Sequence, residues 1–240
     1  MKIIPLSEGT FTVDKTKGFI PFDRQEHEMH DRSAGSLLVE IQPFVVITSK
    51  DILLLDTGLG FEKNGGLQLH QNLMDNGINH SEVTKVLLSH LHKDHAGAVG
   101  LDGRLSFPNA KYYVQRKELI FAFEKGFPSF IIGELQCLKN SEQVVLLDGD
   151  GVIDDYIQYK MTGAHSPYHQ VFWVQEDSKI IFFGGDEAPQ LQQMKHRFVA
   201  KYDFDGRKAM ELRKGWWEKG KNEKWTFLFY HDVKNSGYQC

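Results

Sequence analysis

One nine-residue segment constrains this chain more than any other part of its sequence. Residues 89–97 read SHLHKDHAG and place His90, His92, Asp94 and His95 close together. The segment directly follows residues 83–88, VTKVLL, whose β-branched and apolar side chains predict a buried strand. Three imidazoles and a carboxylate at the end of a strand are hard to explain by folding alone. The segment therefore predicts a metal site rather than a solvated polar turn.

The spacing within this segment predicts which groups share an ion. Residues two apart in an extended segment point the same way, so His90 and His92 can bind one metal ion. The turn that follows can direct Asp94 and His95 toward a second ion. Neutral imidazole nitrogen and carboxylate oxygen suit zinc, and also iron, manganese or cobalt.

Further polar groups follow other strand-like runs, where loops on a rigid scaffold commonly build a site. Residues 162–170, TGAHSPYHQ, offer two histidines, and spacing alone does not decide which of them would be a ligand. The groups are Asp56 in LLLDTG, His165 and His169 in TGAHSPYHQ, Asp186 in FFGGDE and His231 in LFYHD. We expect them to meet at one edge of the sheet system.

Strand-like runs alternate with helix-like ones along the whole chain, which predicts sheets in layers with helices outside. A short turn at residues 49–50 predicts a hairpin. No linker rich in Pro, Gly or Ser divides the sequence, so we expect a single domain over residues 1–240. Strands are predicted at 36–42, 43–48, 51–55, 83–88, 110–115, 144–147, 157–162, 170–174, 179–183 and 225–230, and helices at 67–77, 117–125 and 205–215, the last capped by Asp205.

Composition argues against several classes of partner. The 240 residues carry a net charge of −4, which gives no global attraction to nucleic acid or anionic membranes. No apolar run approaches the roughly 20 residues that a bilayer span needs. The two cysteines, Cys137 and Cys240, form no disulfide framework and favour a reducing compartment. We therefore expect a cytoplasmic protein with no nucleic-acid or membrane partner.

Taken in order, these motifs resemble those of the metallo-β-lactamase-fold superfamily of hydrolases. The LDTG strand end, H-x-H-x-D-H, GAHSPYH, GGD and YHD together span most of the chain, from about residue 36 to residue 232. H-x-H-x-D-H is highly specific in this context, whereas the other motifs would be weak alone. The resemblance implies an α/β fold, a four-layer αβ/βα sandwich of two mixed sheets, with a dinuclear metal site in a cleft along its edge.

The resemblance also implies roles for individual residues. The implied cofactor is a pair of divalent metal ions, zinc first, with manganese or iron as alternatives. Tyr168 and His169 are candidate substrate contacts. The alternatives are a packed aromatic ring for Tyr168, and a pocket wall or a buried, satisfied polar group for His169. The implied ligands are His90, His92 and His165 for one metal, Asp94, His95 and His231 for the other, and Asp186 for both; Asp94 and Asp186 would also move protons, and Asp56 would orient a ligand imidazole.

The function implied is hydrolysis of a small ester, lactone or thioester through a metal-bridging hydroxide. The expected partner is a small-molecule substrate, and the chain can form a homodimer. The compact form with its YHD ending is most similar to the stand-alone lactonase-like group. One departure is Pro189, which stands where quorum-quenching lactonases usually carry a tyrosine. The alternatives are an iron-dependent redox enzyme similar to sulfur dioxygenases, a phosphodiesterase, and a binding protein that kept the fold without the activity.

Overall fold

The first of two main sheets has the strand order β1-β5-β6-β9-β12-β13. The computed structural model describes residues 1–63, 65–139 and 141–240. Pairs β1–β5 and β5–β6 are antiparallel, which confirms the predicted hairpin, and β6, β9, β12 and β13 run parallel. The strands are β1 (Lys2–Pro5), β5 (Phe44–Ile47), β6 (Ile52–Leu55), β9 (Lys85–Leu87), β12 (Lys111–Gln115) and β13 (Val144–Leu147).

The second main sheet has the order β14-β15-β16-β17-β18-β19. Its neighbours are antiparallel except for β17 and β18, which run parallel, so both sheets are mixed as predicted. The strands are β14 (Gly151–Ile153), β15 (Ile157–Met161), β16 (Gln170–Glu176), β17 (Lys179–Phe183), β18 (Thr226–Leu228) and β19 (Gly237–Gln239).

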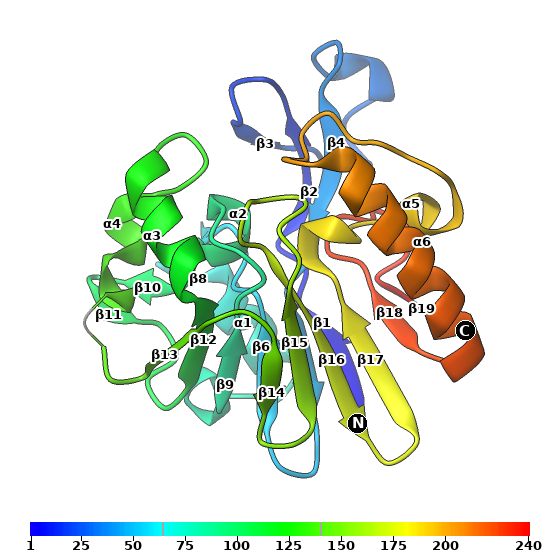
Figure 1. The fold of residues 1–240 in the computed structure, drawn as a ribbon. Helices are drawn as coiled ribbons and strands as arrows, with labels where there is room; N and C mark the ends of the chain where they lie inside the picture. The colour runs from blue at the N-terminus through cyan, green and yellow to red at the C-terminus, as the bar shows by residue number, and fades with distance from the viewer. Residues whose placement is uncertain (64, 140) are drawn as a thin grey trace.

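A smaller sheet of order β3-β2-β4 stands beyond one end of the two main sheets (Figure 1). The turn between β2 and β3 belongs to the rim of the cavity described below. Two further pairs, β7–β8 and β10–β11, are short. These strands are β2 (Gly9–Val13), β3 (Phe19–Pro21), β4 (Leu37–Ile41), β7 (Glu62–Lys63), β8 (Gly66–Leu67), β10 (Gly100–Leu101) and β11 (Arg104–Leu105).

Helices cover the outer faces of both main sheets, and Figure 1 shows the resulting layers. Leu69 and Leu73 of α1 and Leu119 of α3 pack on the first sheet. Leu191 of α5 and Trp216 of α6 pack on the second. The predicted four-layer sandwich is confirmed. The helices are α1 (Gln68–Asp75), α2 (Lys93–Ala96), α3 (Arg116–Lys125), α4 (Ile132–Leu135), α5 (Leu191–Lys195) and α6 (Gly206–Glu223).

The main core lies between the two sheets and fixes their spacing. Phe44 and Leu53 of the first sheet face Phe172 and Ile181 of the second, and all four side chains are buried. The rings of Phe44 and Phe183 meet edge-on with centroids 6.1 Å apart. Burial of such side chains stabilises a fold by about 1.5–3 kcal/mol each. The strand ends therefore form a rigid edge on which a site can be held.

The predicted secondary structure needs correction at the end of one helix and at several strands that it missed. The helix that begins after Asp205 runs to Glu223 and not to Gly215, because Trp216 and Gly220 continue its buried face. The Asp205 carboxylate does accept a hydrogen bond from the Lys208 backbone N–H at 3.0 Å, as a cap should. The strands that were not predicted are β1, β2, β3, β14, β19 and the short strands β7, β8, β10 and β11. Cys137 and Cys240 are unpaired. No helix in the described ranges has the length and apolar character needed to cross a membrane.

Candidate metal centre

Parallel strands bring the candidate ligands to one edge of the sandwich. Leu55 of β6 pairs with Leu87 of β9, so Asp56 and the histidine segment leave the first sheet side by side. In the second sheet, Phe183 of β17 pairs with Leu228 of β18, and residues 186 and 231 follow these strands. Because parallel strands end at the same edge, side chains that are distant in sequence meet there.

A first group of donors consists of His90, His92, His165 and one oxygen of Asp186. His90 Nε2 lies 2.9 Å from His92 Nδ1, and His165 Nε2 lies 3.3 Å from the same His92 nitrogen. His165 Nε2 is also 3.1 Å from Asp186 Oδ2. Three imidazole nitrogens and a carboxylate oxygen thus converge on one point.

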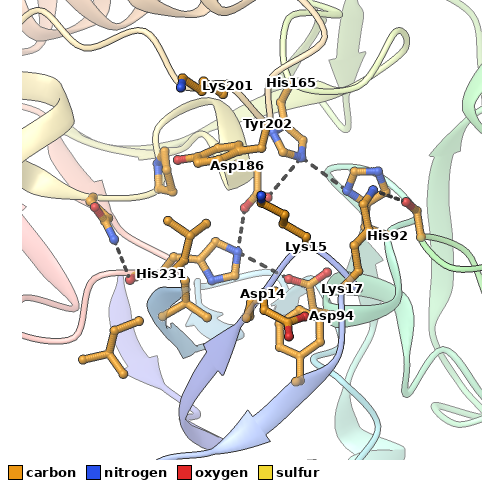
Figure 2. Close-up of a pocket in the computed structure, with 18 of the residues that line it drawn as sticks. Asp14, Lys15, Lys17, His92, Asp94, His165, Asp186, Lys201, Tyr202 and His231 are labelled. Carbon is orange, nitrogen blue, oxygen red and sulfur yellow. Dashed lines mark hydrogen bonds and ion pairs between the residues drawn. The ribbon is translucent and has the colours of Figure 1, made fainter. Parts of the chain in front are cut away.

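A second group consists of Asp94, His95 and His231. His95 Nε2 and His231 Nε2 lie 3.0 Å and 2.9 Å from Asp186 Oδ1. Asp94 Oδ2 is 3.4 Å from His231 Nε2. This group therefore converges beside the first, with Asp186 between them (Figure 2).

Asp186 presents a different oxygen to each group. It lies in a short 3-10 turn, η4 (Gly185–Glu187), directly after β17. Its Oδ2 faces His165 and its Oδ1 faces His95 and His231. A carboxylate with one oxygen toward each of two donor groups has the form of a bridging ligand.

The donor set fits a pair of divalent ions. His95 Nε2 and Asp186 Oδ1 are buried and, although they lie 3.0 Å apart, neither forms a hydrogen bond of acceptable geometry, which is costly unless another group satisfies them. Burial, helped by neighbouring imidazoles, holds the pKa of His90 and His92 well below the usual value, so both rings are neutral and offer a lone pair. Imidazole nitrogens and carboxylate oxygens in two adjoining groups are the ligands that zinc and similar ions prefer.

Asp56 has the contacts expected of a residue that orients a ligand imidazole. The carboxylate is fully buried, and its Oδ2 lies 2.8 Å from His95 Nδ1, which leaves His95 Nε2 facing the site. Asp56 also accepts hydrogen bonds from the backbone N–H and the hydroxyl of Ser89, both at 2.7 Å. The Ser89 hydroxyl is in turn 3.0 Å from His90 Nδ1. One carboxylate thus positions a histidine in each donor group.

The structure separates His165 from His169, which the spacing could not do. His165 Nε2 joins the first donor group, whereas His169 Nε2 accepts a hydrogen bond from the Asp186 backbone N–H at 3.3 Å. The His169 side chain is fully buried and does not line the cavity. The structure thus supports the buried-polar-group alternative for His169, whose ring contacts the turn that carries Asp186.

Tyr168 also lies away from the cavity. Its ring packs edge-on against Phe121, with centroids 5.8 Å apart, and Tyr168 does not belong to the cavity lining. The packed-aromatic alternative is the one that the structure supports. Tyr202, which the sequence did not single out, is the tyrosine that lines the cavity. Its hydroxyl accepts a hydrogen bond from Gln193 Nε2 at 3.1 Å.

Two buried acidic residues hold the His165 loop and were missed from sequence. Asp203 Oδ1 lies 2.9 Å from His165 Nδ1, and its side chain is fully buried. Glu187 Oε1 accepts hydrogen bonds from the backbone N–H groups of Ala164 and His165, at 2.6 Å and 3.2 Å. Asp203 lies in an irregular segment before α6, so no periodicity or motif could have identified it.

We expect Asp203→Asn to weaken metal binding by about 10–100-fold, as is typical when the partner of a ligand histidine changes. The amide keeps the shape but removes the negative charge beside His165 Nδ1. Competition with a chromophoric chelator measures the affinity. Asp205→Asn is the control, because asparagine caps a helix as well as aspartate. Equal metal affinities of the native protein, Asp203→Asn and Asp205→Asn would contradict the role of Asp203.

A buried glutamate supports the loop that follows Asp56. Glu8 Oε2 accepts a hydrogen bond from the Leu59 backbone N–H at 2.6 Å. Gly58 has a φ of +76° and lies so close that a Cβ there would be 2.4 Å from Glu8 Oε2, which explains the glycine. Burial raises the pKa of Glu8 to about 7, and the hydrogen bonds from the loop backbone, which lower it, only partly offset this rise.

This raised pKa predicts a pH-dependent stability. The folded protein keeps the Glu8 proton up to about pH 7, whereas the unfolded chain releases it above about 4.5. Native stability is therefore lost as the pH rises through this window. We expect Glu8→Gln to gain up to roughly 3 kcal/mol relative to the native protein between about pH 5 and about pH 8.

Urea unfolding of both proteins in chelator, at several pH values across this range, measures the difference. Glu142→Gln, at an exposed glutamate, is the control and is expected to show no such trend. A constant difference between Glu8→Gln and the native protein at all pH values would contradict the buried, protonated state of Glu8.

A cavity of about 690 Å³ opens over the two donor groups. Among the candidate ligands, its wall includes His92, Asp94, His165, Asp186 and His231. The turn between β2 and β3 and the segment between α5 and α6 form parts of its rim. His27 and His30 are exposed and do not line it.

Residues 39–214 match the sequence profile of the metallo-beta-lactamase superfamily, well over half of the chain. The chain belongs to the metallo-beta-lactamase superfamily. The resemblance inferred from the motifs is thereby confirmed, together with the fold class.

The chain is similar in sequence to curated lactonases. An N-acyl homoserine lactonase, AttM, from Azorhizobium caulinodans is 36% identical over 110 residues, which cover 41% of this chain and 38% of that protein. An N-acyl homoserine lactonase from Bacillus thuringiensis is 25% identical over 158 residues, covering 66% of this chain and 59% of that protein. The alignments thus span about half the length of these relatives.

Solved structures share the fold over nearly the whole length of this chain. A probable metal-dependent hydrolase from Staphylococcus aureus has a TM-score of 0.77 at 18% identity, covering 99% of this chain and 91% of that one. AidC, a dizinc quorum-quenching lactonase in complex with a product, has a TM-score of 0.75 at 17% identity, covering 98% and 88%. At these identities the likeness establishes the fold.

Proposed function

We propose that this chain is a metal-dependent hydrolase that holds two divalent ions, most favourably zinc, and cleaves a small lactone, ester or thioester. The observation that carries the proposal is the Asp186 carboxylate, which faces His165 with one oxygen and His95 and His231 with the other. In this proposal the two ions are held by the two donor groups, and Asp186 is shared. The full set of seven donors suits two ions better than one.

Two bound ions would supply Lewis acidity and would lower the pKa of bound water toward roughly 7. The chain's own residues do the rest in this proposal. Asp56 and Asp203 hold His95 and His165 with their Nε2 atoms toward the centre. Asp94 and Asp186 both line the cavity, so either carboxylate can carry a proton from the attacking water to the leaving oxygen.

A lactone is the first substrate class to test. The curated relatives are N-acyl homoserine lactonases, and the cavity combines apolar walls with a polar floor at the donor groups. Pro189 does line the cavity at the position where such lactonases usually carry a tyrosine. The acyl group and the leaving group are therefore expected to differ from those of the relatives.

Metal content and turnover test the proposal together. Protein purified without a His tag or added metal is analysed for elements, then assayed on N-hexanoyl homoserine lactone, an aryl ester, a thioester and a phosphodiester. We expect about two zinc ions per chain and acid release from at least one acyl substrate, lost in chelator and restored by zinc. One iron per chain with oxygen consumption, or turnover of the phosphodiester alone, would replace the proposal with a redox enzyme or a phosphodiesterase.

A further inference from the structure

Four lysines surround the mouth of the cavity, and they come from three separate parts of the chain. Lys15 and Lys17 lie in the turn between β2 and β3, Lys93 begins α2, and Lys201 lies between α5 and α6. Figure 2 shows three of them, Lys15, Lys17 and Lys201, around the candidate ligands. The chain as a whole carries a net charge of −4, so this concentration of positive charge is local.

These ammonium groups have no carboxylate partners among the described residues. Among the described residues, the lysine side chains that form ion pairs are those of Lys85 and Lys219, and neither lines the cavity. Lys17 Nζ donates a hydrogen bond to the Ser129 hydroxyl. Lys93 Nζ lies 5.5 Å from the centre of the Phe19 ring. No salt bridge among the described residues therefore neutralises the charges at the cavity mouth, although Lys93 interacts with the half-buried Glu134 at longer range.

Negative charge inside the cavity is already engaged. Apart from the candidate ligands Asp94 and Asp186, the carboxylate in the lining is that of Asp14. Asp14 Oδ1 accepts hydrogen bonds from the backbone N–H and the hydroxyl of Thr16, at 2.8 Å and 2.6 Å. An incoming anion would thus meet several ammonium groups without ion-pair partners, and Asp14 is the one lining carboxylate outside the candidate ligands.

The rest of the wall is apolar. Leu37, Phe198 and Val199 line the cavity and are 45%, 45% and 50% exposed, an unusual state for large apolar side chains that face a site. The same wall includes Val13, Phe19, Leu38, Val39 and Pro128. The cavity thus offers apolar contact and positive charge at the same time.

We propose that the substrate is an amphipathic anion, an ester, thioester or lactone whose apolar chain carries a carboxylate or phosphate group away from the bond that is cleaved. This inference rests on the proposed function and narrows its substrate class. The apolar wall would take the chain, and the lysines at the mouth would attract and hold the anionic group. Charge at a cavity mouth also raises the association rate of an oppositely charged ligand.

Binding to metal-free protein tests the anion site without any metal contribution. In chelator, calorimetry compares octyl phosphate, octanoate and the neutral octyl glucoside, which share one alkyl chain. We expect at least one of the two anions to bind at least about tenfold more tightly than the glucoside. The affinity for that anion is expected to fall in high salt. Preference for one anion then identifies the group as phosphate or carboxylate. Equal affinities for the glucoside and the anions would overturn the proposal.

A double substitution tests the lysines themselves. Lys15→Gln with Lys201→Gln removes two charges without touching residues beside the candidate ligands, and we expect it to weaken anion binding by about tenfold while leaving glucoside binding unchanged. The matched control is Lys160→Gln with Lys179→Gln, two exposed lysines outside the cavity lining. An equal loss in the control would show a net-charge effect and overturn the site.

Hydrolysis by the zinc-loaded protein separates this inference from the proposed function. Aryl esters of octanoate and of octanedioate monoanion differ by one terminal carboxylate. A lower KM for the anionic ester, lost in the Lys15→Gln, Lys201→Gln variant, supports both proposals. Cleavage of both esters with equal KM overturns the inference and keeps the hydrolase. Anion binding to the cavity without cleavage of any acyl substrate keeps the anion site and overturns the hydrolase.

Discussion

Asp186→Asn is expected to reduce the metal content from about two ions per chain toward one. Loss of a hydrogen-bond partner of a metal ligand typically lowers activity about 10–100-fold, and we expect kcat of this variant to fall further than that. The carboxylate faces His165 with Oδ2, and His95 and His231 with Oδ1. An amide keeps one oxygen and replaces the other by an NH₂ group, which cannot coordinate a metal. One donor group therefore loses its shared ligand, and the other keeps it.

Elemental analysis after dialysis and a steady-state assay on the best substrate measure the two effects of this variant. Circular dichroism shows whether the fold is retained. Asp177→Asn is the matched control, because Asp177 lies in the exposed turn before β17 with a φ of +54°, a conformation that asparagine also tolerates. Two tightly held ions and unchanged turnover in Asp186→Asn would remove the bridging role.

Gly97→Ala is expected to destabilise the protein by roughly 3 kcal/mol, although alanine is the better helix former. Gly97 has an ordinary helical φ of −65°, so the requirement is space and not backbone conformation. A Cβ at this position would lie 2.3 Å from the carbonyl carbon and oxygen of Leu59, and 2.6 Å from the Lys93 oxygen. These are backbone atoms, which cannot move aside as a flexible side chain would.

The same substitution is expected to weaken metal binding. Relief of the contact must separate the loop that follows Asp56 from α2, which carries Asp94 and His95. Urea unfolding in chelator gives the stability, and chelator competition gives the metal affinity. Gly215→Ala is the control: this exposed glycine of α6 has open space at its Cβ, and alanine there is expected to stabilise by about 0.5–1 kcal/mol. Equal effects of the two substitutions would contradict the close approach at Gly97.

The sequence was most informative where chemistry and local pattern coincide. Residues 89–97 place three imidazoles and a carboxylate at the end of an apolar strand, and the other ligand candidates also follow strands. The structure brings all seven into two adjoining groups, although their role as metal ligands stays a prediction. The alternation of strand and helix also predicted the layers, because periodicity reports which side chains are buried.

The sequence was least informative where a role depends on a contact across the fold. Asp203 meets His165 across 38 residues, and Glu8 meets the loop at Leu59 across 51, and neither spacing carries a local signal. Spacing left His165 and His169 undecided, and the resemblance favoured His165. In the structure, His165 faces Asp186 and His169 accepts its backbone N–H.

What the sequence by itself determined is therefore most strands and helices, which follow from periodicity, and the fold class and candidate donor set, which follow from motifs that resemble those of the superfamily. What only the tertiary structure decided is the distances between the donors, the buried Asp203 beside His165, and the mouth where lysines from three segments meet an apolar wall. The physical reason is that coordination and substrate recognition depend on distances between side chains that are remote in the chain. Only packing of the two sheets against each other sets those distances.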